Sequence, residues 1–478
     1  MIVPANIFRE YDIRGVADRD LSDDLAEGIG RGLGAMLSAG SGGDRALRRA
    51  VGRDCRLSSP RLHAALLRGL SKVGVDVVDI GVGPTPMLYF AVHHLDTDGG
   101  VMITGSHNPG DENGFKMMRG KASFYGADIQ KLRERIVAKD FGRPPARAGQ
   151  VENFDVQDAY VKTMQERFDF KGADIAQGLR FTLDSGNGSG GPLGVRTMKA
   201  LGLAPDALFC EMDGRFPNHH PDPTVEKNLA ALVARVKETK ARVGIAYDGD
   251  ADRVGAVDAE GNVIWGDKLL ILFARDVLQK NPGATILGEV KCSQTLYDDI
   301  AKHGGKPLVW KTGHSLIKTK MKETGALLAG EMSGHVFFAD RYFGYDDAIY
   351  ASLRLLEILA KDPRPLAEML ADVPKTFSTP ELRVDCPDAI KFQVVAAVTR
   401  RYKEKGNPVV DIDGARISFA DPGSPGASSA PKWGLVRASN TGPILVMRFE
   451  AGTQEELAQI RGEVESVVTE ERAKLASS

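Results

Sequence analysis

The chain has 478 residues, 42% hydrophobic and 26% charged, which is enough for about three or four domains with sizeable cores. The formal net charge of -2 gives no basic excess, and this argues against a nucleic-acid partner. The 4 cysteines are far apart and form no Cys-x-x-Cys pair, which disfavours both a zinc site and a disulfide framework.

The first third of the chain alternates short β-branched runs with amphipathic stretches, which is typical of an α/β domain. Leucine or isoleucine recurs every fourth residue over 21–33 and predicts a helix there. Ser59, which is followed by proline, is expected to be the N-cap of the next helix. Strands are predicted over 75–80 and 100–103, and the second of these leads directly into a loop that contains Ser106.

Three later strands are also predicted to end in polar, glycine-containing loops. A strand over 180–183 runs into Asp-Ser-Gly-Asn-Gly, a strand over 243–247 ends at Asp248, and a short one at 327–328 precedes the loop 330–335. In open α/β sheets, ligand sites lie where strands end in loops. The strand ends are therefore the expected location of a functional site.

The pattern of the sequence changes after a proline-rich stretch between residues 361 and 380. Thr453 and Glu456 form a predicted capping box for a last helix, and this region is expected to be a small α+β domain. The predicted domains are 1–150, with the Ser106 loop; 151–256, with an acidic loop; 257–371, with the loop 330–335; and 372–478.

The acidic loop contains Asp248, Asp250 and Asp252, three carboxylates that alternate directly after an apolar strand. Hard cations such as Mg2+ or Ca2+ prefer this oxygen-only set of ligands. A solvated acidic turn is the simpler alternative, but the preceding strand and the adjacent Arg253 disfavour it. An EF-hand is excluded, because its loop requires glycine at position six and glutamate at position twelve, where this chain has Arg253 and Ala259.

The Ser106 loop reads Thr-Gly-Ser-His-Asn-Pro over residues 104–109. A serine nucleophile needs a neighbouring base or an electrophilic partner, and His107 and Lys116 are near enough in sequence to serve. No Gly-x-Ser-x-Gly elbow surrounds Ser106, which disfavours an α/β-hydrolase. Taken alone, the segment could equally be an ordinary Asn-Pro turn.

Two further loops carry polar groups that suit a sugar phosphate. Glu331, Ser333 and His335 can form hydrogen bonds with sugar hydroxyls. The segment 437–441 combines an arginine with two hydroxyl side chains, a suitable set for binding a phosphate. Either segment, taken alone, could be a polar surface loop.

Together, these loops and the N-terminal segment 8–15 resemble the α-D-phosphohexomutase superfamily, most closely its phosphomannomutase/phosphoglucomutase branch. Thr-Gly-Ser-His-Asn-Pro and Gly-Glu-Met-Ser-Gly-His are typical of that branch. A phosphoglucosamine mutase would more typically have alanine before Ser106 and glutamine in place of Met332. The resemblance implies three related mixed-sheet α/β domains plus a smaller, flexible C-terminal α+β domain around a central cleft.

The resemblance also implies an activity, the interconversion of hexose 1-phosphate and hexose 6-phosphate with mannose or glucose as the sugar. Ser106 would carry a phosphate and bind Mg2+ together with Asp248, Asp250 and Asp252, and hexose 1,6-bisphosphate would be the intermediate and the activator. The other implied catalytic residues are Arg14, His107, Lys116, Arg253 and His335, and the implied substrate-binding residues are Tyr11, Lys291, His314, Glu331, Ser333, Arg437, Ser439, Asn440 and Thr441. Lys116, Arg14 and His335 are candidate general bases, and Lys116 would need a lowered pKa for that role.

Alternatives remain at this stage: a phosphoglucosamine mutase, a Mg2+-dependent sugar phosphatase, or a non-catalytic sugar-phosphate sensor. An ATP-dependent sugar kinase is disfavoured, because the string nearest to a phosphate-binding loop, residues 261–268, has Asp267 where the lysine should be and Lys268 where serine or threonine should be. No secretion signal and no apolar run of ~20 residues are seen, so we expect a cytoplasmic protein without a membrane partner. We expect it to act on small-molecule hexose phosphates as a monomer or weak homodimer.

Overall fold

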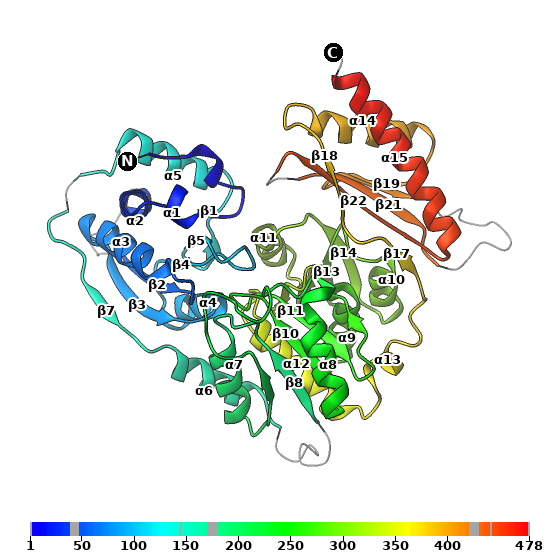
Figure 1. Cartoon of the computed structure of the whole chain (residues 1–478), viewed down its shortest axis with the longest axis horizontal. Coiled ribbons are helices and arrows are strands. Elements are labelled where there is room, and N and C mark those ends of the chain that lie inside the picture. The colour runs from blue at the N-terminus through cyan, green and yellow to red at the C-terminus, as the bar shows by residue number, and fades with distance from the viewer. Residues whose placement is uncertain are drawn as a thin grey trace.

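The structure is a computed structural model and describes residues 2–38, 47–143, 145–170, 179–419, 430–439 and 442–476. Four β-sheets follow one another along the chain, and each is flanked by helices (Figure 1). This is the predicted arrangement of three α/β domains and a smaller α+β domain. Among the described residues, no helix has both the length and the apolar character needed to cross a membrane.

The first domain is a mixed sheet in the order β1-β5-β4-β2-β3-β7, with the short β6 paired to β5. Its central strands are parallel, whereas β5 runs antiparallel to both β1 and β4. Its elements, after a 3-10 helix at Ala5–Ile7, are β1 Ile13–Val16, α1 Ala17–Asp20, α2 Asp23–Ser38, β2 Arg48–Arg53, α3 Ser59–Lys72, β3 Asp76–Val82, α4 Thr85–His94, β4 Gly100–Ile103, β5 Glu112–Arg119, β6 Ala122–Ser123, α5 Ala127–Ala138 and β7 Val151–Asn153.

Helices α2 and α3 pack closely because each has a glycine at the contact. A Cβ on Gly30 would lie 2.5 Å from the carbonyl oxygen of Leu66, and one on Gly69 would lie 2.2 Å from that of Glu27. The predicted N-cap of α3 was wrong: the cap position is Ser58, and Ser59 is the first helical residue. The Ser59 hydroxyl does not cap the helix, because it donates a hydrogen bond to the buried Asp54 carboxylate at 2.5 Å.

The second domain is a five-stranded sheet in the order β12-β11-β10-β8-β9, in which β8, β9 and β10 are parallel. It comprises α6 Gln157–Arg167, β8 Phe181–Asp184, α7 Gly191–Ala200, β9 Asp206–Leu208, a 3-10 helix at Glu226–Leu229, α8 Ala230–Thr239, β10 Val243–Tyr247, β11 Val254–Asp258 and β12 Val263–Ile264. Strand β7 belongs to the first sheet and β11 to the second, so the sheets extend past the boundaries expected at 150 and 256.

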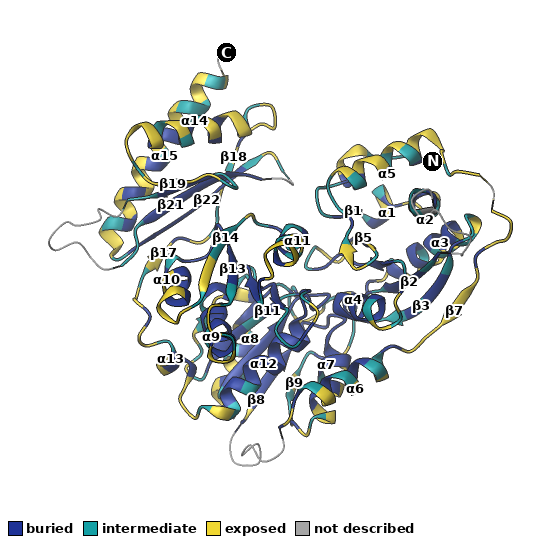
Figure 2. Cartoon of the chain, turned by 180° about the vertical axis from the view of Figure 1, so that it is seen from behind, coloured by how far each residue is buried: buried dark blue, intermediate teal, exposed yellow. Residues whose placement is uncertain are grey.

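The third domain has a four-stranded sheet in the order β14-β13-β15-β16. Its elements are α9 Gly266–Lys280, β13 Thr285–Glu289, α10 Gln294–Lys302, β14 Lys306–Trp310, α11 His314–Thr324, β15 Leu328–Gly330, β16 Val336–Phe338, α12 Ala348–Lys361 and α13 Leu366–Met369. Helix α11 lies between the first and fourth domains in both views (Figures 1 and 2). The start of this helix is therefore well placed to connect three domains.

The fourth domain is an antiparallel sheet in the order β17-β22-β21-β20-β19, with β18 also paired to β22. It comprises β17 Phe377–Ser378, β18 Leu382–Asp385, α14 Lys391–Glu404, β19 Val409–Val410, β20 Ala415–Ser418, β21 Trp433–Ala438, β22 Ile444–Ala451 and α15 Gln454–Ala476. One half of the predicted capping box of the last helix is present, because the amide of Glu456 donates to Thr453 Oγ1 at 3.1 Å; among the described residues, Glu456 Oε2 has no hydrogen-bond partner.

The apolar core is not divided equally among the four domains. One cluster of buried side chains includes α4 and one face of the first sheet and continues through the second and third domains. The fourth domain has its own cluster, which the buried strands in Figure 2 reflect. The first three domains therefore share apolar packing, while the fourth folds around a separate core.

Candidate functional site

The acidic loop follows β10, whose five residues are all buried. Asp248, Asp250 and Asp252 have no exposed surface, and one carboxylate oxygen from each lies within 4.8 Å of the others. Asp248 Oδ1 accepts the amides of Asp252 and Arg253 at 3.1 and 3.2 Å, which closes the turn. The loop therefore directs three carboxylates into one buried cluster.

This cluster fits a hard divalent cation. Among the described residues, Oδ1 of Asp250 and Oδ1 of Asp252 are buried and have no hydrogen-bond partner. Burial, followed by repulsion from Asp252 and Asp250, raises the pKa of Asp248 well above its usual value. Buried anionic oxygens without partners are costly, and a metal ion removes that cost. Oxygen ligands of this kind are those that Mg2+ takes.

Ser106 lies directly beside the acidic cluster, although 142 positions separate it from Asp248 in sequence. Its hydroxyl donates to Asp248 Oδ2 at 3.1 Å and lies 3.2 Å from His107 Nδ1. The residue has a positive φ of 50°, an uncommon conformation outside glycine. The buried Arg56 supports this backbone by donating to the carbonyl oxygens of Ser106 and Asn108, both at 2.7 Å.

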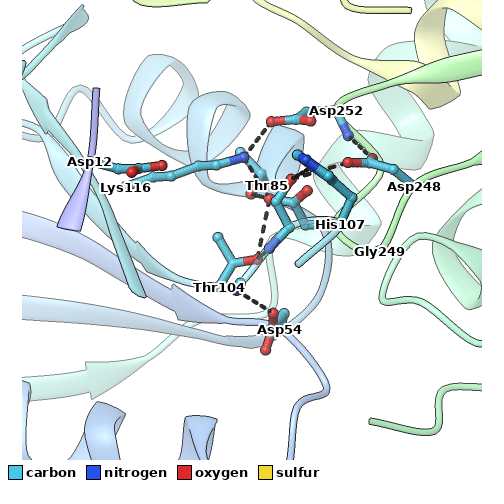
Figure 3. Close-up of polar contacts among 12 residues, drawn as sticks. Asp12, Asp54, Thr85, Thr104, His107, Lys116, Asp248, Gly249 and Asp252 are labelled. Atoms are coloured by element: carbon cyan, nitrogen blue, oxygen red, sulfur yellow. Dashed lines mark hydrogen bonds and ion pairs between the residues drawn. The ribbon is translucent and has the colours of Figure 1, made fainter. Parts of the chain in front are cut away.

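Lys116, on β5, reaches across from the first domain to the acidic loop of the second (Figure 3). Its Nζ donates to Asp250 Oδ2 at 2.7 Å and also to Asp252. Burial by itself would lower the pKa of Lys116, but the carboxylates of Asp250 and Asp252 outweigh it and raise this pKa. The structure thus gives the opposite of the lowered pKa that the general-base role of Lys116 would require, and Lys116 is an ammonium here.

Other polar groups surround the same cluster. Thr85 and Thr104 donate their hydroxyls to Asp250 Oδ2 at 2.5 and 3.2 Å (Figure 3). Arg14 is held by Asp12 at 2.7 Å and donates to Asn108 Oδ1 at 2.8 Å. Asp250 therefore accepts hydrogen bonds from two hydroxyls as well as from Lys116, and Arg14 lies against the Ser106 loop through Asn108.

The same cations affect His107, which lies beside Ser106. Burial, then Arg253, Arg14 and Lys116, lower the pKa of His107 well below its usual value. His107 is therefore a neutral imidazole in this environment, and it adds no positive charge of its own. A group that is buried among cations resists protonation for the same electrostatic reason.

The third domain contributes the loop between β15 and β16. Arg253 Nε donates to His335 Nε2 at 3.0 Å, so His335 is the tautomer with its proton on Nδ1. That Nδ1 lies 3.0 Å from the buried Asp346. Glu331 Oε1 accepts the amide of Gly313 at 2.7 Å, which links the loop to the start of α11. His335 Nδ1 also lies 3.6 Å from Asp252 of the metal loop, and Glu331 Oε2 lies 4.0 Å from His335 Nε2.

Residues around α11 connect the first, third and fourth domains. The Tyr11 hydroxyl donates to the carbonyl of Thr312 at 3.0 Å, and the amide of Thr312 donates to Asp413 at 3.0 Å. Arg437 Nε in turn donates to the same Asp413 oxygen at 3.2 Å. His314, the first residue of α11, has its ring 6.0 Å from that of Tyr11 and 5.6 Å from that of His335.

The remaining predicted substrate residues lie in the third and fourth domains. Lys291 Nζ lies 3.3 Å from Glu381 and 3.6 Å from Glu289, at the junction of the third and fourth domains. Ser439 is buried beside Arg437, and Ser333 is half-buried in its loop. Asn440 and Thr441 lie outside the described residues.

Sequence reasoning missed Asp346, Glu289, Thr85 and Arg56, all of which contact site residues. Glu289 is fully buried and accepts the amide of Met332 at 3.2 Å. It is the last residue of β13, so the rule that sites lie at strand ends could have found it. Asp346 has no such signal, because it lies in an irregular loop before α12.

Comparison with known proteins agrees with this geometry. Family models for the phosphoglucomutase/phosphomannomutase alpha/beta/alpha domains I, II and III match residues 5–143, 158–261 and 265–377, and the model for the C-terminal domain matches 381–467. A phosphomannomutase/phosphoglucomutase from Pseudomonas aeruginosa is 46% identical over 460 residues, which cover 96% of this chain and 94% of the relative. The chain belongs to the phosphoglucomutase/phosphomannomutase family.

This phosphohexomutase has other similar relatives. A phosphoglucomutase from Neisseria gonorrhoeae is 44% identical over 469 residues, covering 98% of this chain and 97% of the relative. A solved phosphoglucomutase/phosphomannomutase family protein from Burkholderia thailandensis is 42% identical, with a TM-score of 0.88 and 98% of each chain covered. A structure of a Thermus thermophilus protein, at 24% identity and a TM-score of 0.77, shares the fold.

Proposed function

We propose that this phosphohexomutase moves a phosphoryl group between the 1- and 6-hydroxyls of mannose or glucose phosphates, with Ser106 as the phosphate carrier. The observation that supports this most directly is the position of the Ser106 hydroxyl, 3.1 Å from a carboxylate of a fully buried three-aspartate cluster. A serine in this setting is suited to holding a phosphate next to a metal ion rather than to attacking a peptide or ester.

The charges around Ser106 explain why a cation belongs there. A phosphoserine carries about -1.5 to -2 charges, which three neighbouring carboxylates would repel. Asp248, Asp250, Asp252 and the Ser106 phosphate would hold Mg2+. When bound, the ion neutralises part of the negative charge of the carboxylates and the phosphate, and it stabilises the phosphoryl group during transfer.

Positively charged side chains contribute to the same task. Lys116 and Arg14 come from the first domain and Arg253 from the second, and each lies against the Ser106 loop or the acidic loop. They would bind the oxygens of the phosphoryl group as it moves. Protonated Lys116 suits proton donation to a departing hydroxyl oxygen, whereas the Nε2 lone pair of His335 would first have to leave its hydrogen bond with Arg253 before it could accept a proton.

The other end of the sugar phosphate would be bound by the fourth domain. Arg437 and Ser439, together with Asn440 and Thr441, form the proposed site for the phosphate that is not being transferred. Glu331 and Ser333 would bind hydroxyls of the ring, with Tyr11, Lys291 and His314 around it. The 1,6-bisphosphate must turn end for end, and movement of the fourth domain would keep water out meanwhile.

A coupled assay with mannose 1-phosphate, glucose 1-phosphate and glucosamine 1-phosphate, with a trace of hexose 1,6-bisphosphate, tests the proposal. Formation of mannose or glucose 6-phosphate is expected, and Ser106→Ala should lose most of it, whereas Ser466→Ala, at an exposed position of α15, should keep it. Full activity in Ser106→Ala would refute the carrier role.

The alternatives predict other results in the same assay. Free inorganic phosphate without isomerisation indicates a phosphatase, turnover of glucosamine 1-phosphate alone indicates a phosphoglucosamine mutase, and inactivity on all three sugars favours a sensor. A cytoplasmic location and a monomeric or weakly dimeric state stay predictions from the sequence.

A further inference from the structure

A cavity of about 460 Å³ lies between the first and third domains. Its lining comes from α4, the β5–β6 hairpin, α11, the segment between α11 and β15, and the loop after β16. Among the described residues, none of those assigned above to the metal, the sugar or the phosphates lines it. Its volume falls within the ~300–1,000 Å³ that small-molecule sites usually have.

The lining of the cavity is positively charged. It includes Lys121, Lys318 and Lys322, and no acidic residue is among the described residues that line it. Lys121 lies 3.1 Å from the exposed Asp96, and Lys318 donates to Asp346 at 2.9 Å. In the part of the chain that the structure describes, Lys322 has no carboxylate within 4.0 Å. A concave surface with this balance of charge attracts an anion.

Aromatic side chains form another part of the wall. Phe343 is 40% exposed, although it is large and apolar, and its ring lies 4.8 Å from that of His93. The ring of Tyr345 is 6.0 Å from Phe343 and within 10° of parallel to it. Burial and the nearby Lys121 lower the pKa of His93 to about 4, so this ring is neutral near pH 7. The guanidinium carbon of Arg167 lies 5.2 Å from the centre of the Phe343 ring, and the part of this ring that is exposed to the cavity is suited to contact with a flat ring.

We propose that this cavity binds a planar aromatic anion of the size of a nucleoside monophosphate. The flat ring of the ligand lies on Phe343, and its anionic group lies beside Lys322 and Lys121. Stacking alone would accept many flat rings, and lysines alone would accept many anions. A ligand that has both a flat ring and an anionic group contacts both parts of the cavity wall. Lys318 is engaged with Asp346, which in turn holds His335, so Lys318 is left unchanged in the test.

Isothermal titration of the full chain with AMP, adenosine and inorganic phosphate tests this site, in an excess of glucose 6-phosphate to fill the sugar-phosphate site. AMP is expected to bind at least about tenfold more tightly than adenosine or phosphate. Lys322→Glu and Phe343→Ala should each weaken AMP at least about tenfold. Lys280→Glu, the same charge change at an exposed position at the end of α9, should bind AMP as the wild type does.

Circular dichroism shows whether each variant is folded. If a variant does not fold, Lys121→Glu is used in its place in the titration. The proposal is overturned if AMP does not bind at millimolar concentration, if glucose 6-phosphate displaces it, or if Lys280→Glu weakens it as much as Lys322→Glu does. Because the quantity measured is AMP binding and not product formation, this result is independent of whether the proposed mutase reaction is correct.

Discussion

Replacing Lys116 with methionine should destabilise the metal-free protein, and Mg2+ should restore much of the loss. Lys116 donates to Asp250 and Asp252, and its side chain is 5% exposed while theirs are fully buried. Methionine keeps the length of the side chain but leaves those carboxylates without their cation. Breaking a buried ion pair from one side costs about 3–5 kcal/mol. A metal at one hundred times its Kd returns about 2.7 kcal/mol.

Thermal unfolding followed by circular dichroism, in EDTA and in Mg2+, measures this effect. The matched control is Lys162→Met at an exposed position of α6. Loss of Lys116 leaves carboxylates whose protonation becomes favourable, so the deficit in EDTA should shrink as the pH falls. The reasoning is refuted if Lys116→Met unfolds in EDTA at the wild-type temperature, or if Mg2+ stabilises both proteins equally.

Two further predictions concern stability against pH and the geometry at α11. Burial lowers the pKa of His219, but Asp184 at 3.0 Å outweighs it and the pKa is raised. The stability that this pair contributes is therefore complete below about pH 6.5 and is lost as the pH rises through the raised pKa. His219→Gln should therefore lower the free energy of unfolding, measured in urea, by more at about pH 5 than at about pH 9. An equal loss at both pH values would contradict this. Gly313 has a φ of 126°, and an added Cβ would lie 2.6 Å from the Tyr11 ring, so Gly313→Ala should lower kcat/KM and cost about 1–3 kcal/mol. Gly283→Ala, at a φ of 80° in open space, should leave kcat/KM unchanged, and an equal loss in both variants would argue against a role for Tyr11.

The ends of strands were predictable because the signals are local. An apolar run that stops at charged residues identifies β10 and its acidic loop, and β4 with the Ser106 loop is recognised in the same way. The alternation of helices and strands likewise predicts the α/β class. Residue boundaries were less certain, since β7 and β11 join sheets by hydrogen bonds that the sequence does not display.

The protonation state of Lys116 could not be predicted in this way. Its two carboxylate partners lie 134 and 136 positions away, so the sequence alone could not tell whether cations or anions would surround it. Asp346 was missed for a related reason: it neighbours Asp347, which caps α12 in the expected manner, and only the fold brings Asp346 to His335. Long-range electrostatics therefore marks the limit of sequence reasoning here.

The central claim is that Ser106 carries the transferred phosphate. Peptide mass spectrometry of the protein after incubation with hexose 1,6-bisphosphate should find one phosphoryl group on Ser106, and later addition of hexose 6-phosphate should move this group to the sugar. Phosphate on another residue, or its loss to water with no sugar bisphosphate formed, would contradict the account.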